Sequence, residues 1–182
     1  MPSAEAYGDP TLLHSVDLFD TPSLTEFVVE GTHGDHIYTF LNSTSILRSS
    51  FPALASFSFI SEDYNCPCDI TTGCSVDRRI SASSFAPFPA LSTLTLINQC
   101  FTAYLVRDLL GPGSQPWPLL KKVTLCPPES SFDDVRDALQ GAMDSKRQCG
   151  QPFPEVKLFH PLPDPENWHD SSFTSVEVEV FG

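Results

Sequence analysis

The chain has 182 residues, with 10 Lys and Arg against 23 Asp and Glu, so its formal net charge is −13 at pH 7. This charge disfavours binding to nucleic acid or to anionic membrane surfaces, because both are themselves negative. The 17 prolines argue against long helices and coiled coils, and the 14 phenylalanines argue against disorder.

The first twenty residues are predicted to be an acidic lead-in, 1–20, in front of a single domain at 21–182. The first residues lack the basic and apolar segments of a signal peptide. No stretch approaches the ~18 consecutive apolar residues of a membrane span. We therefore expect a cytoplasmic or nuclear protein that is not secreted and whose cysteines are thiols.

A repeated motif organises the chain: proline, any residue, an apolar residue, two further residues, then two apolar residues separated by one position. Four copies begin at Pro22, Pro52, Pro89 and Pro118, which are 30, 37 and 29 residues apart. The last two apolar positions of each copy alternate with polar ones, which is typical of a strand with one buried face. Strands are predicted near 25–29, 56–60, 92–96 and 121–125.

A fifth copy near Pro154 is degenerate, because its apolar pair follows the proline by two and four residues rather than by five and seven. It still predicts a strand at 155–158. The terminal run 175–180 alternates strictly and predicts a last strand, in which Glu177 and Glu179 discourage further pairing.

Helices are predicted between some of the strands. The residues Phe101, Tyr104, Leu105 and Leu109 fall on one helical face, and this helix is expected to end at Gly111-Pro112. A second helix is predicted over 132–148. It would be capped by Ser131, carry Lys146 and Arg147 at its C-terminal end, and stop at a left-handed Gly150.

Repeated strand and helix units favour parallel strands that stack into an open structure. The predicted fold is α/β: a leucine-rich-repeat-like open solenoid with a mostly parallel sheet and helices on one side. Residues at about 61–87 show no period and are predicted to be an inserted loop.

Residues that alternate with the buried positions are expected to line the concave face of the solenoid, where a partner would bind. These candidate binding residues are Glu26, Val28, Glu30, Ser56, Ser58, Thr93, Thr95, Lys122, Thr124 and Lys157. The same alternation adds Ile60, Ile97 and Glu155 to this face. Because the first strand is acidic, we expect a protein partner with a basic segment.

Catalytic, cofactor and metal sites are not predicted. The chain has no G-x-S-x-G elbow, P-loop or G-x-G-x-x-G motif. The alternative is a small metal-binding protein or enzyme that uses the loop cysteines Cys66, Cys68 and Cys74, although their C-x-C-x5-C spacing is not a standard zinc knuckle. The remaining cysteines, Cys100, Cys126 and Cys149, are interpreted as small buried apolar residues.

The phrases 88–96 (FPALSTLTL) and 117–125 (WPLLKKVTL), with the helix at 132–148, resemble the C-terminal leucine-rich-repeat region of F-box proteins from mushroom-forming fungi. The resemblance spans about residues 21–182. It implies a non-catalytic scaffold like the repeats that recognise substrates for ubiquitin ligases. In that family an N-terminal F-box docks on an adaptor; no such helical pattern precedes Leu24, so adaptor docking is not expected of these residues.

Overall fold

The computed structural model describes residues 23–30, 51–60, 85, 88–97, 102–111, 119–160 and 178–181. Within these residues lie six strands, β1 (Glu26–Glu30), β2 (Ser56–Ile60), β3 (Thr93–Ile97), β4 (Lys122–Cys126), β5 (Glu155–Phe159) and β6 (Val178–Phe181). The same residues include two α-helices, α4 (Thr102–Leu110) and α5 (Phe132–Gln148), and the 3₁₀ turn η3 (Glu129–Ser131). The predicted lead-in at 1–20 lies outside the described residues.

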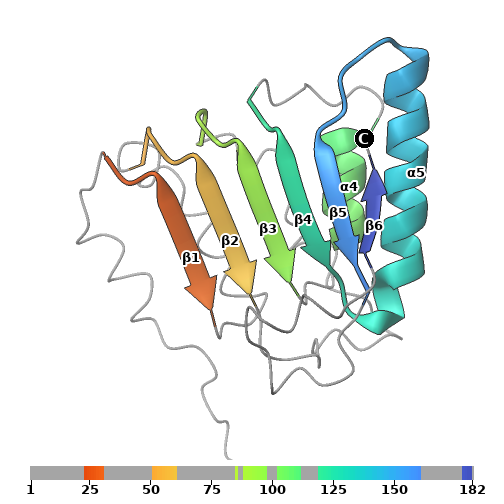
Figure 1. The fold of residues 1–182 in the computed structure, drawn as a ribbon, viewed down its shortest axis with the longest axis horizontal. Helices are drawn as coiled ribbons and strands as arrows, with labels where there is room; N and C mark the ends of the chain where they lie inside the picture. The colour runs from red at the N-terminus through yellow and green to blue at the C-terminus, as the bar shows by residue number, and fades with distance from the viewer. Residues whose placement is uncertain are drawn as a thin grey trace, which may run out of the picture.

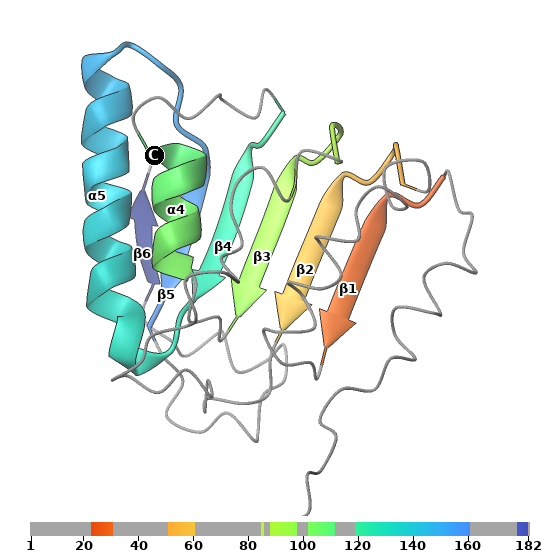
Figure 2. The same cartoon turned by 180° about the vertical axis from the view of Figure 1, so that it is seen from behind.

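The strands form one open sheet in the order β1-β2-β3-β4-β5-β6. All neighbours from β1 to β5 are parallel, and β6 pairs antiparallel with β5. Figure 1 shows the strands side by side with α4 behind them, and Figure 2 shows α4 in front of the sheet when the molecule is turned round. A mixed α/β structure with an open, mostly parallel sheet and two described helices is therefore confirmed.

The proline of the second and third copies opens a tight turn that leads into the strand. In the second and third copies the N–H of Leu54 donates to the Phe51 carbonyl at 3.3 Å, and that of Leu91 to the Phe88 carbonyl at 3.1 Å. Proline suits the second position of such a turn because its φ angle is already near the required value. The turn then places the aromatic residue before the proline and the leucine after it in the core, where all four are at most 3% exposed.

The turns of successive copies are joined by a recurring pair of hydrogen bonds. The carbonyl of Thr25 accepts from Ala55 and Ser56, that of Ala55 from Ser92 and Thr93, and that of Ser92 from Lys121 and Lys122, all at 2.8 to 3.1 Å. The three acceptors occupy the same position of the motif. This recurrence holds each strand in the same register as its neighbour, as a repeat should.

The fifth copy has only one of the two hydrogen bonds, because a proline occupies the position of the second donor. Glu155 donates to the Lys121 carbonyl at 2.9 Å, but Pro154 stands where the second donor would be and has no N–H to give. Val156 and Leu158 nevertheless pair in register with Val123 and Leu125. In this copy the proline stands closer to the strand than in the others, but the strand keeps its register with β4.

The core lies on the face of the sheet that carries the buried strand residues, and α4 and α5 add their apolar side chains to it. Its centre is Phe57, fully buried on β2, whose ring lies 6.0 Å from that of Phe27 and 6.1 Å from that of Phe88 on the neighbouring repeats. Phe85 meets Phe57 edge-on at 5.9 Å and is also fully buried. Phe85 falls within the predicted loop at 61–87, so at least this residue belongs to the core; the rest of that loop lies outside the described residues.

Helix α4 buries part of the predicted face, and Phe101, which was also predicted on it, lies outside the described residues. Leu105 and Leu109 are buried as expected, but Tyr104 is 47% exposed. The buried face also includes Ala103 and Val106, and α4 packs against α5. The helix ends at Gly111, as predicted, where any Cβ atom would collide with the Arg107 carbonyl.

Helix α5 spans the predicted residues, but its ends differ in how they are capped. Ser131 makes no side-chain bond to the helix: its hydroxyl donates back to the Pro128 carbonyl at 3.2 Å, because η3 precedes the helix directly. The predicted Ser131 cap is therefore wrong. At the other end Gly150 has a φ of +63°, and the N–H of Gln151 donates to the Lys146 carbonyl at 2.9 Å, which completes a Schellman motif.

Candidate functional site

The face of the sheet opposite the helices, called the open face below, carries the predicted binding residues. Strand pairing arranges them in two rows that cross the strands. The first row is Glu26, Ser56, Thr93, Lys122 and Glu155, and the second row is Val28, Ser58, Thr95, Thr124, Lys157 and Val180. The strands of these rows are seen from the open face in Figure 1.

Burial follows the alternation of the sequence. Along β2 and β3 the residues Phe57 and Leu94 are fully buried, while the Ser and Thr positions beside them remain partly exposed. Glu26, Lys122 and Lys157 are exposed, and Val28 is 45% exposed. Side chains on alternate positions of a strand point to opposite faces, so this pattern assigns the two rows to one surface.

Charge on the open face is unevenly distributed. Glu26 stands at the β1 end, whereas Lys122 and Lys157 stand on β4 and β5. Lys157 Nζ lies 3.8 Å from Glu155 Oε1, and both side chains are about half exposed, at 50% and 49%. An exposed pair at this distance stabilises a fold by only ~0.2–1 kcal/mol, so these charges remain able to engage a partner.

Two of the predicted residues, Glu30 and Ile97, are the last residues of their strands. The backbone of Glu30 pairs with Ile60 at the end of β1, and its side chain lies outside the described residues. Ile97 was expected on the open face but is only 2% exposed. Its neighbour in the register, Cys126, is fully buried as well, and Cys126 Sγ lies 3.8 Å from the His160 carbonyl oxygen.

The apolar end of the open face could have been recognised in the sequence. Ile60, Ile97 and Cys126 occupy one position of the repeat and pair across three strands. An apolar residue recurring at one position in three repeats is typical of buried surface rather than of a solvated face. Two of the three, Ile97 and Cys126, are buried, whereas Ile60 is partly exposed, so on β3 and β4 the exposed part of the open face ends after the second row.

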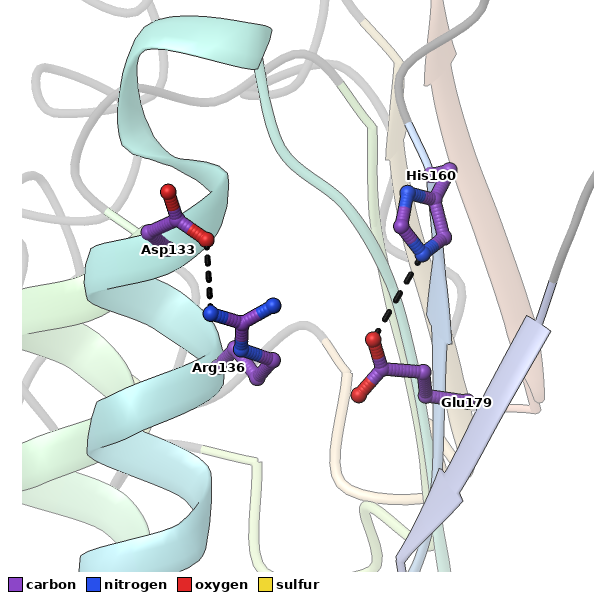
Figure 3. A network of polar contacts seen from close by, with 4 residues as sticks. All are labelled: Asp133, Arg136, His160 and Glu179. Atoms are coloured by element: carbon purple, nitrogen blue, oxygen red, sulfur yellow. Dashed lines mark ion pairs between the residues drawn. The ribbon is translucent and has the colours of Figure 1, made fainter.

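A polar cluster at the start of α5 was not predicted from the sequence. Figure 3 shows His160 and Glu179 facing each other, with Asp133 and Arg136 paired on the helix. His160 Nε2 lies 3.5 Å from Glu179 Oε1, and Arg136 Nη2 lies 2.8 Å from Asp133 Oδ1. The His160 ring also packs on Phe132 at 4.2 Å between centroids. The contacts of His160 join α5 and β6 to the end of β5, which are separated in sequence, so local patterns do not reveal them, whereas the Arg136–Asp133 pair is a local i, i+3 pair within α5.

Two of the six cysteines, Cys126 and Cys149, lie among the described residues. Cys126 is buried, as predicted, but Cys149 is exposed, because it directly follows the last turn of α5, next to Gly150. The prediction that Cys149 is a buried apolar residue is therefore wrong. Cys66, Cys68, Cys74 and Cys100 lie outside the described residues. Within the described residues no group of three or more His, Cys, Asp or Glu side chains could hold a metal ion.

A shallow hollow of about 320 Å³ lies between α4 and α5 on the helical side. Arg107 and Asp137 supply its polar groups, and the small residues Gly111, Ala138, Gly141 and Ala142 form the rest of its lining. The hollow follows from the small side chains that let the two helices pack closely, so packing alone accounts for it.

Comparison with protein-family models, with curated proteins and with solved structures finds no match to this chain. Among the described residues, none of the helices is long and apolar enough to span a membrane.

Proposed function

We propose that this protein is a non-catalytic protein-interaction scaffold whose partner binds to the open face of the sheet. The observation that carries the proposal is the pair of rows, polar except for Val28, that cross β1 to β5 and remain exposed or partly exposed. Their side chains alternate with a fully buried set, so substitutions among them leave the core untouched. A sheet that presents a largely polar surface across several strands is suited to binding an extended partner.

We further propose that the fold is a leucine-rich-repeat-like open solenoid. The turns of the second and third copies and the hydrogen bonds from one copy to the next recur at the same motif positions, which supports a repeat architecture. The resemblance of 88–96 and 117–125 to the repeats of fungal F-box proteins makes recognition of ubiquitin-ligase substrates the specific role proposed. That role implies a location in the cytoplasm or nucleus.

Blocking the centre of the open face tests the proposal. Thr95 lies on β3 between Ser58 and Thr124, so Thr95→Arg fills the middle of the second row with a long charged side chain. The matched control is Gln140→Arg, an exposed position on α5. A partner identified by affinity capture with the wild-type protein should be lost with Thr95→Arg and kept with Gln140→Arg.

Two other outcomes would contradict binding at the open face. A partner that binds Thr95→Arg as tightly as the wild type, while both variants show wild-type unfolding curves, would contradict binding at the open face. A partner lost only with Gln140→Arg would move the binding surface to the helical side.

A further inference from the structure

We infer that the segment bound by the open face is an extended peptide that crosses the strands, with a basic residue at one end and an acidic residue four or six positions away. This inference rests on the proposed function and names the class of partner. It follows from three properties of the two exposed rows: their charge, their hydroxyl groups and their length.

The charge of the rows changes sign from one end to the other. The β1 end presents the carboxylate of Glu26, which is exposed. The β4 and β5 end presents the ammonium groups of Lys122 and Lys157 against the single carboxylate of Glu155. In a chain with a net charge of −13, this locally positive end is unusual. A basic side chain is favoured over β1 and an acidic one over β4 and β5.

The middle of the rows is neutral and rich in hydroxyl groups, contributed by Ser56, Ser58, Thr93, Thr95 and Thr124. Each hydroxyl can both donate and accept a hydrogen bond, so it can pair with either an N–H or a C=O of a peptide backbone. Serine and threonine are also short, which lets a backbone come close to the sheet. The centre therefore fits the main chain of an extended segment, while the two ends select its charged side chains.

The length of the rows sets the spacing of those charges. Neighbouring strands are ~4.8 Å apart, so β1 is ~14 Å from β4 and ~19 Å from β5. An extended chain advances ~3.3 Å per residue, and these spans correspond to about four and about six residues. Even separations also place both side chains on the same side of an extended peptide, as binding to one surface requires.

A second copy of the chain is a less suitable occupant. Two chains of charge −13 repel each other. A short peptide segment needs less area and supplies its own complementary charges.

Selection from a displayed library of random twelve-residue peptides tests the inference. Wild-type protein should enrich peptides with one basic and one acidic residue separated by four or six positions. Glu26→Lys makes both ends of the rows basic, so it should enrich peptides with two acidic residues at that spacing. Lys122→Glu combined with Lys157→Glu makes both ends acidic and should enrich peptides with two basic residues.

The control is Asp108→Lys, which changes the net charge as Glu26→Lys does but lies exposed on α4. It should enrich the same peptides as the wild type. A selected wild-type peptide, measured by fluorescence anisotropy, should bind Glu26→Lys about five- to tenfold more weakly and Asp108→Lys within about twofold of the wild type.

The variant Thr95→Arg distinguishes a failure of the charge inference from a failure of the proposed function. If it abolishes binding but the charge pattern of the enriched peptides does not respond to Glu26→Lys or to the double lysine variant, the charge inference is wrong and the open face remains the binding surface. If the selected peptides bind Thr95→Arg normally, the proposed function is wrong as well. If the wild-type protein enriches no peptide beyond an empty-support control, the inference is overturned.

Discussion

Truncating Leu94 to alanine measures how strongly the buried face of the sheet holds the fold together. Leu94 is fully buried on β3, where it pairs in register with Phe57 on one side and Val123 on the other. The substitution removes three carbon atoms, for which lost burial alone costs ~2.4 kcal/mol at ~0.8 kcal/mol per group. The cavity left between strands that cannot collapse raises the expected loss to ~3–5 kcal/mol.

The matched control is Thr95→Ala on the adjacent position of the same strand. Thr95 is partly exposed on the open face, so its truncation should change the free energy of unfolding by about 0.5 kcal/mol or less. Urea unfolding followed by circular dichroism measures both, and the slope against urea should stay unchanged if only stability is altered. Equal destabilisation by the two substitutions would show that the assigned faces of the sheet are reversed.

Three further predictions concern the end of α5 and the cysteines. Gly150→Ala should destabilise the protein by ~1 kcal/mol in thermal unfolding, because Gly150 has a φ of +63°. Gly141→Ala should stabilise it by ~0.5–1 kcal/mol, because Gly141 lies inside a helix and nothing is within 4 Å of the new Cβ. In the native protein a thiol reagent should modify exposed Cys149 and spare buried Cys126 until urea unfolds the chain, as peptide mass spectrometry would show; equal labelling contradicts this assignment. Elemental analysis should find far less than one zinc per chain, and near-stoichiometric zinc lost on thiol alkylation would favour the alternative metal-binding function of the loop cysteines.

Strand positions were predictable because one physical pattern recurs at every strand. Each predicted strand is present within about one residue from β1 to β5, since a two-residue alternation with one buried face admits only one register. For the last predicted strand, 175–180, the described part is β6, which begins at Val178. The span of α5 was also predictable, because its apolar stripe and its C-terminal glycine are both local signals.

The details that could not be predicted depend on contacts between distant segments. Tyr104 has the same spacing as a buried helical residue, but the approach of α5 decides which side of α4 is covered. Ser131 has the right side chain for a cap, yet the 3₁₀ turn before it takes its hydroxyl. His160 and Glu179 are 19 residues apart in sequence and meet only because β6 returns antiparallel to β5.

The candidate binding surface was predictable in position but not in extent. The alternation that buries Phe57 and Leu94 also assigns the residues beside them to the open face. It does not say where that face ends, because a strand pattern does not show what packs over its last residue. Ile97 illustrates the limit: it follows the alternation of Thr93 and Thr95, but it is buried with Cys126.

The degenerate fifth repeat shows which signal controls the register of the sheet. In the first four copies the proline stands four residues before the strand, whereas Pro154 directly precedes Glu155. If the proline set the register, Val156 would not pair with Val123. It does pair, because a slip by an odd number of residues would turn Val156 and Leu158 out of the core and Lys157 into it. The burial of two apolar side chains therefore outweighs the turn motif, and it is this register that places Lys157 beside Thr124 on the open face.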